Sequence, residues 1–70
     1  MVKIAAHITG TVVKIEKEVG DAVRAGEPVL VIESMKMEMP VEAQGEGTVR
    51  EIRCVEGQAV NEGDVLVVLE

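Results

Sequence analysis

Hydrophobic residues in this chain fall into short runs that are separated by glycine-centred turns. The runs at residues 29–32 and 65–69 are continuous, rich in β-branched side chains and bounded by turn residues, a pattern typical of strands covered on both faces. Pro28 opens the first of them, where a missing N–H costs little. The pattern favours strands over helices and predicts about eight, at residues 2–6, 11–17, 22–23, 29–33, 37–43, 48–55, 59–60 and 65–69.

The chain also contains an internal repeat. An offset of 37 residues aligns residues 10–33 with residues 47–70 without a gap. Three glycines recur at equal spacing, so both halves are expected to turn the backbone at the same places. The repeat predicts two copies of one supersecondary unit, assembled as an all-β barrel with a pseudo-two-fold axis. The identical positions, numbered in the first copy, are Gly10, Thr11, Val12, Ile15, Gly20, Ala22, Val23, Gly26, Val31 and Glu33.

One internal segment, residues 34–46, lies outside this repeat. It joins the strand ending at Glu33 to the strand beginning at Met37, so the chain must reverse in a tight hairpin with Met35 and Lys36 at its tip. Tips of two residues favour Asn-Gly or Asp-Gly, because both positions adopt positive φ. Met-Lys disagrees with that preference, and a disagreement of this kind indicates function.

A lysine displayed at a hairpin tip has a chemical use. Its neutral amine is a nucleophile for acyl transfer. Because lysine amines are mostly protonated at neutral pH, Lys36 would need an activated acyl donor and a partner enzyme. Met35, Met37 and Met39 alternate along the chain. We expect Met39 to line the core, and Met35 and Met37 to contact partners with their adaptable side chains.

Composition narrows the classes of function. The chain has 70 residues, enough for one domain over residues 1–70 with a modest aliphatic core, and no Phe, Trp or Tyr. It carries 7 Lys plus Arg against 13 Asp plus Glu, a net charge of −6, with no basic run, which argues against nucleic acid. No apolar run approaches the roughly 20 residues that span a bilayer, and no signal peptide is evident. We therefore expect a soluble, cytoplasmic, monomeric domain.

His7 and Cys54 are each the single residue of their type. One histidine without a Cys-x-x-Cys partner gives no metal site. A histidine and a cysteine in different repeats, with no supporting motif, give no catalytic triad. Cys54 is interpreted as a half-buried strand residue, and the lack of a disulfide partner fits a reducing compartment. The sequence predicts no catalytic residue and no metal site.

The hairpin motif resembles one found in a known family. Glu33-Ser34-Met35-Lys36-Met37 is similar to the attachment motif of biotinyl carrier domains, Glu-Ala-Met-Lys-Met, with Ser34 in place of the usual alanine. The resemblance covers nearly the whole chain, including the Gly-Thr-Val that begins each repeat. It implies a flattened eight-stranded barrel of two four-stranded antiparallel sheets, with the biotinyl lysine at one end.

The sequence departs from the family in two places. The common Ala-Pro-Met-Pro-Gly reads Ala6-His7-Ile8-Thr9-Gly10 here, so its prolines are missing. The chain is also too short for the protruding thumb of some acetyl-CoA carboxylase carriers. It therefore resembles the thumbless single-domain type, and an initial Met1 favours a free-standing subunit.

The resemblance implies that biotin is amide-linked to Lys36 and that Met35 and Met37 are recognised by biotin protein ligase. The domain would be the biotin carboxyl carrier of a biotin-dependent carboxylase, for example an acyl-CoA carboxylase. In that role it shuttles a carboxyl group from biotin carboxylase to a carboxyltransferase. It is a carrier and performs no chemistry of its own.

Two alternatives remain open at this point. Lipoyl domains of 2-oxoacid dehydrogenases are related in fold and display an Asp-Lys-Ala tip, whereas this chain has Met-Lys-Met, which argues for biotin over lipoate. The second alternative is an unmodified interaction module, in which the Met-Lys-Met tip contacts a partner directly.

Overall fold

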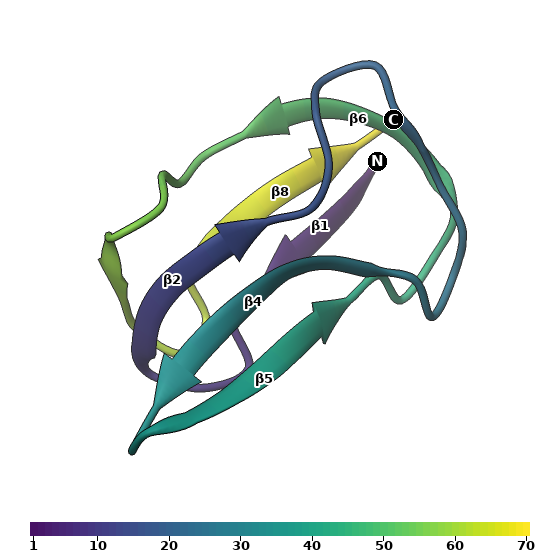
Figure 1. The fold of residues 1–70 in the computed structure, drawn as a ribbon. Coiled ribbons are helices and arrows are strands. Elements are labelled where there is room, and N and C mark those ends of the chain that lie inside the picture. The colour runs from purple at the N-terminus through teal and green to yellow at the C-terminus, as the bar shows by residue number, and fades with distance from the viewer.

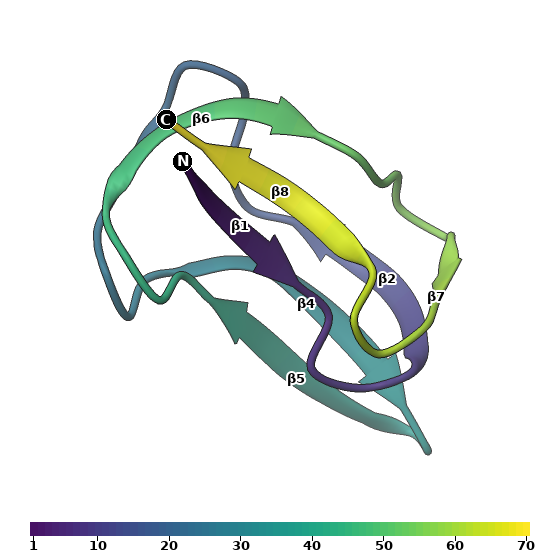
Figure 2. The same ribbon diagram turned by 180° about the vertical axis from the view of Figure 1, so that it is seen from behind.

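Two four-stranded antiparallel sheets face each other as a flattened barrel (Figures 1 and 2), which confirms the predicted fold class. The structure is a computed structural model that describes residues 1–70, and it contains no helix that is long and apolar enough to cross a membrane. Sheet A has the strand order β1 (Val2–Ala5), β8 (Val65–Leu69), β6 (Gly47–Ile52) and β3 (Ala22–Val23). Sheet B has the strand order β5 (Met37–Glu42), β4 (Pro28–Ser34), β2 (Gly10–Ile15) and β7 (Ala59–Val60).

The pseudo-two-fold axis exchanges the two sheets. The strands β2, β3 and β4 correspond to β6, β7 and β8, and even the irregularities recur. The register of β2 with β4 shifts at Val13, and the register of β6 with β8 shifts at its counterpart Arg50. Each copy therefore has the same backbone, although the side chains at these two bulges differ completely.

The repeat is longer than its sequence identities indicate. Strand β1 pairs with β8 through Val2 and Leu69, just as β5 pairs with β4 through Met39 and Ile32. Residues 2–9 thus have their counterpart in residues 39–46, where only one of the eight side chains is identical. The segment outside the repeat shrinks from the predicted residues 34–46 to residues 34–38, because strand pairing was retained while the side chains diverged.

Each repeat holds the turns of the other. The backbone N–H of Gly20 donates to the carbonyl oxygen of Val49 at 2.8 Å, and the N–H of Gly57 donates to Val12 at 2.7 Å. These hydrogen bonds draw the chain away from its own sheet after Ile15 and after Ile52. For this reason β2 and β6 end earlier than the predicted strands 11–17 and 48–55.

The core between the sheets is entirely aliphatic apart from one thiol. Cys54 is 6% exposed and follows the end of β6, so the prediction of a half-buried strand residue is wrong on both points. Its side chain turns inward because the chain there crosses the barrel rim toward the turn at Gly57. The core residues are Ile4, Ala6, Val12, Val23, Val29, Leu30, Ile32, Val41, Ala43, Val49, Cys54, Val60, Leu66, Val67 and Leu69.

Candidate functional site: the β4–β5 hairpin tip

The turn between β4 and β5 contains two residues. Ser34 pairs with Met37 in the last register step, which leaves Met35 and Lys36 to reverse the chain, as predicted. Their φ angles are 54° and 64°, and they are the only non-glycine residues with positive φ. Two consecutive left-handed residues define a type I′ turn, which matches the twist of a hairpin. For side chains other than glycine this conformation costs roughly 1–2 kcal/mol per residue.

The tip displays its side chains to solvent. Met35 is 91% exposed, the largest exposure among the big apolar residues, and Met37 is 64% exposed. Lys36 is also exposed, and its amine takes part in none of the side-chain hydrogen bonds and ion pairs, which engage Lys14, Lys17, Arg50 and Arg53. The tip therefore presents one free amine between two adaptable apolar side chains.

A stiff support stands behind the tip. Strand β4 is paired on both sides, with Thr11 of β2 opposite Glu33 and Glu38 of β5 on the other side. Ile32 of β4 is fully buried in the core. Met39 lies opposite Ile32 and is half-buried, but it is not among the side chains packed against the core, where we had expected it.

The hairpin tip lies at the end of the barrel opposite the two termini. Both views show it projecting beyond the loop between β1 and β2 (Figures 1 and 2). That loop is tied to the neighbouring turn, because the N–H of Gly63 donates to the carbonyl of Ala6 at 2.9 Å and the N–H of Glu62 donates to the Thr9 hydroxyl at 3.2 Å. The tip is therefore accessible, whereas the loop beside it is held by hydrogen bonds.

The other chemically reactive side chains lie elsewhere. His7 is exposed and lines a shallow groove with Pro40 and Gln44. The Cys54 thiol lies 3.9 Å from the carbonyl oxygen of Leu66, and its burial raises its pKa. No group of three or more His, Cys, Asp or Glu side chains is placed to hold a metal ion. The structure therefore brings no other reactive side chain to Lys36.

One group of residues was not singled out from the sequence. Lys3, Arg50 and Arg53 gather on the outer face of sheet A, although they are distant in sequence. The repeat itself contains the signal, because none of their counterparts under the 37-residue offset is cationic. Comparing charges between the aligned copies would have drawn attention to Arg50 and Arg53, whereas the place of Lys3 beside them depends on strand pairing.

Comparison with known proteins gives the family. Residues 1–69 match the family described as biotin-requiring enzyme, with a biotin/lipoyl attachment domain. The biotin/lipoyl attachment protein of Bacillus subtilis is 41% identical over 66 residues, which is 94% of this chain and 90% of that protein. The mitochondrial propionyl-CoA carboxylase alpha chain of Homo sapiens is 46% identical over 67 residues, which is 96% of this chain but 9% of that one.

Solved structures agree with the fold. The Kluyveromyces lactis urea carboxylase matches with a TM-score of 0.91 and 38% identity, over 97% of this chain and 6% of that chain. The lipoyl domain of the 2-oxoglutarate dehydrogenase complex from Azotobacter vinelandii matches with a TM-score of 0.80 and 33% identity, over 100% of this chain and 96% of that chain. The chain belongs to the biotin/lipoyl attachment family and is a carrier domain homologous to the biotin carboxyl carrier domains of biotin-dependent carboxylases.

Proposed function

We propose that this chain is a biotin carboxyl carrier in which biotin is amide-linked to Lys36. The observation that carries the proposal is the geometry of the tip, where an exposed amine without a partner stands between exposed Met35 and Met37. A narrow two-residue turn can enter the active site of a modifying enzyme. The amine of Lys36 does not have to be released from an ion pair before it reacts. When the amide forms, the amine loses a proton and an activated biotinyl donor loses its leaving group.

The hairpin around Lys36 provides a rigid support for a mobile attached group. Strand pairing holds the hairpin, while the lysine side chain and the attached group form a flexible arm. When bound, biotin supplies a ring that accepts a carboxyl group at one active site and gives it up at another. Tethering keeps the local concentration of that ring high at both sites. The partners are then biotin protein ligase, biotin carboxylase and a carboxyltransferase.

The two methionines support biotin rather than lipoate. Where lipoyl domains are expected to have an acid and an alanine, Met35 and Met37 offer apolar surface on both sides of the lysine. An apolar tip favours a ligase site that is itself apolar, and it disfavours one that recognises a carboxylate. The 46% identity to a propionyl-CoA carboxylase chain supports the same choice. The similarity in fold to a lipoyl domain keeps lipoylation as the second candidate.

Intact-mass measurement tests this directly. The chain would be co-expressed with a biotin ligase, and in a parallel culture with a lipoyl ligase, and then weighed and blotted with avidin. We expect a gain of one biotinyl group in the first culture, none in Lys36→Arg, and full modification in the control Lys14→Arg. A biotinylated Lys36→Arg chain, or a wild type that gains only a lipoyl group, would contradict the proposal. A wild type unmodified in both cultures would favour the interaction module.

A further inference from the structure

The outer face of sheet A contains a shallow groove of about 440 Å³. Its floor is Val68, which pairs in register with Lys3 on β1 and Glu51 on β6. Figure 2 is seen from this side of the barrel, with β1, β8 and β6 toward the viewer. We call this feature the basic groove, and the residues that line it are Met1, Lys3, Arg50, Glu51, Arg53 and Val68.

The basic groove opposes the charge of the rest of the molecule. It contains three of the 7 cationic side chains but one of the 13 carboxylates, which leaves four cations and twelve carboxylates elsewhere. Arg53 forms an ion pair with Glu51 at 2.6 Å. Arg50 contacts only the sulfur of Met1, at 3.0 Å, and Lys3 has no polar partner. Two cations are therefore available to an incoming anionic group.

The internal repeat allows the outer face of sheet A to be compared with the equivalent face of sheet B. The counterparts of Lys3, Arg50 and Arg53 on the outer face of sheet B are Pro40, Val13 and Glu16. Sheet B has the same strands, pairing and bulge with none of these cations. Folding of the barrel therefore does not require the positive charges of the basic groove.

The floor of the basic groove is shielded from solvent. Val68 is only 3% exposed although it lies on the outer face, while its counterpart Val31 is half-buried. Lys3 is the cross-strand neighbour of Val68 and Arg50 lines the same groove, so two long aliphatic stems stand beside the valine while both residues remain exposed. This arrangement gives an apolar floor with a cationic rim, as in the centre and edge of a protein interface.

We propose that the basic groove is a docking surface for an acidic segment of a partner protein, separate from the hairpin tip. Charge complementarity identifies the occupant. The side chain of Met1 and the aliphatic stems of Lys3 and Arg50, which line the groove beside Val68, suit a segment that carries an apolar side chain among its acids better than a small polar anion. The basic groove lies toward the termini, because Lys3 and Val68 are only one register step from the terminal pair Val2 and Leu69. A partner bound there leaves the tip free at the opposite end.

Chemical-shift mapping tests the proposal on the full 70-residue chain. An isotope-labelled sample would be titrated at low salt with a hexaglutamate peptide that has one central leucine. We expect amide shifts at Lys3, Arg50 and Val68, and weaker binding as salt is added, because exposed charges are screened. Neutralising two rim charges in Lys3→Gln/Arg50→Gln should weaken the affinity about tenfold.

The matched control is Lys14→Gln/Arg24→Gln, which removes two cations elsewhere and should bind like the wild type. Both double variants replace exposed residues and keep Lys36, so thermal unfolding and biotinylation are checked independently of peptide binding. Equal weakening in the two variants, or no binding at low salt, would refute the docking surface.

Displacement of the peptide by millimolar inorganic phosphate would point to a small-anion site. Self-association in sedimentation, lost in the rim variant, would assign the basic groove to a second copy. Either of these last two results would also overturn the proposal.

Discussion

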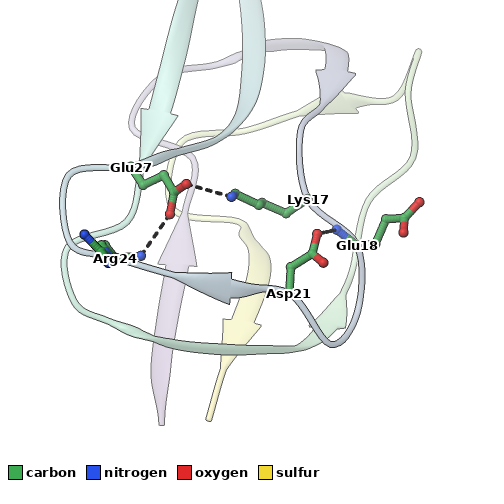
Figure 3. A network of polar contacts seen from close by, with 5 residues as sticks. All are labelled: Lys17, Glu18, Asp21, Arg24 and Glu27. Atoms are coloured by element: carbon green, nitrogen blue, oxygen red, sulfur yellow. Dashed lines mark hydrogen bonds and ion pairs between the residues drawn. The ribbon is translucent and has the colours of Figure 1, made fainter.

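Lys17 and Cys54 occupy equivalent positions in the two repeats, yet Lys17 forms a partly buried ion pair while Cys54 lies in the core. The Lys17 amine lies 2.7 Å from Oε2 of Glu27, and the same carboxylate accepts the backbone N–H of Arg24 at 3.0 Å (Figure 3). In the second repeat the turn is closed by Asp64, which accepts the N–H of Asn61 at 2.8 Å. A carboxylate thus closes the turn in the same way in both repeats. The repeats differ in the ion pair of Lys17 and the buried thiol of Cys54, and each can be tested separately.

The ion pair makes stability depend on pH. The hydrogen bond from Lys17, followed by that from the N–H of Arg24, lowers the pKa of Glu27 below its ordinary value of 4.5. A carboxyl group with a lowered pKa in the folded state stabilises the fold above its ordinary pKa, and the contribution is lost as the pH falls through the folded value. Glu27→Gln should therefore lower the melting temperature at pH 7, and the difference from the wild type should shrink as the pH falls below 4.5.

Thermal unfolding from pH 7 to pH 3 measures this effect. Glu46→Gln is the control, because that carboxylate has no ion pair. A gap between wild type and Glu27→Gln that stays constant over the whole pH range would show that the charge of Glu27 is irrelevant. Added salt should narrow the gap at pH 7, since the pair is partly exposed.

The buried thiol should react slowly. Burial raises the pKa of Cys54, and the reactive species of a cysteine is its thiolate. Labelling of the native chain with a disulfide reagent at pH 8 should be much slower than labelling in denaturant, and it should accelerate in destabilised variants, because the thiol is reached through opening of the barrel. A native labelling rate equal to that in denaturant would contradict the buried position.

Two glycines are required for different reasons. A Cβ at Gly10 would lie 2.7 Å from Cγ2 of Ile32 and even closer to the carbonyl oxygen of Glu33. At Gly20, φ is +99° and no atom lies within 4 Å of a Cβ. Gly10→Ala should cost about 2–3 kcal/mol through overpacking, and Gly20→Ala about 1–2 kcal/mol through backbone strain. Urea denaturation measures both. A smaller cost for Gly10 would mean that β2 and β4 separate easily.

The fold was predictable because the internal repeat shows each sequence pattern, the spaced glycines and the apolar runs, twice. Glycine spacing located the turns at Gly20 and Gly57, and uninterrupted apolar runs located β4 and β8. The hairpin tip followed from chain direction alone, since β4 enters and β5 leaves within two residues. Both tip residues indeed have the positive φ that the turn requires.

Three features could not be predicted, each because it depends on spatial neighbours. The correspondence of β1 with β5 is a matter of pairing, and only Ala6 and Ala43 preserve it in sequence. The inward turn of Cys54 depends on the crossing of the chain to the other sheet. The basic groove joins Lys3 to Arg50, which are adjacent only after β1 and β6 pair with β8.

The strain at the tip can be separated from its function. Asn tolerates the left-handed conformation better than methionine. Met35→Asn should therefore stabilise the fold by about 0.5–1 kcal/mol in urea denaturation while slowing biotinylation by the ligase. Met37→Asn is the control, because Met37 lies in β5 and lacks a positive φ. It should give no stabilisation. If Met35→Asn left the biotinylation rate unchanged, the methionine at this position would have no recognition role.

The identity of the cargo depends on the residues on either side of Lys36. Met35→Asp/Met37→Ala gives the tip an acid and a small residue without altering the turn length, so the lysine stays in the same place. If the ligases read these side chains, the variant should lose biotinylation and gain lipoylation in intact-mass measurements after co-expression with each ligase. The single variants separate the two contributions. Met39→Ala, two residue pairs further from the tip than Met37, serves as the control and should still be biotinylated. A double variant that accepts biotin as fast as the wild type would show that the ligase recognises the shape of the hairpin, and the methionines would then need another explanation, such as contact with the carboxylase itself.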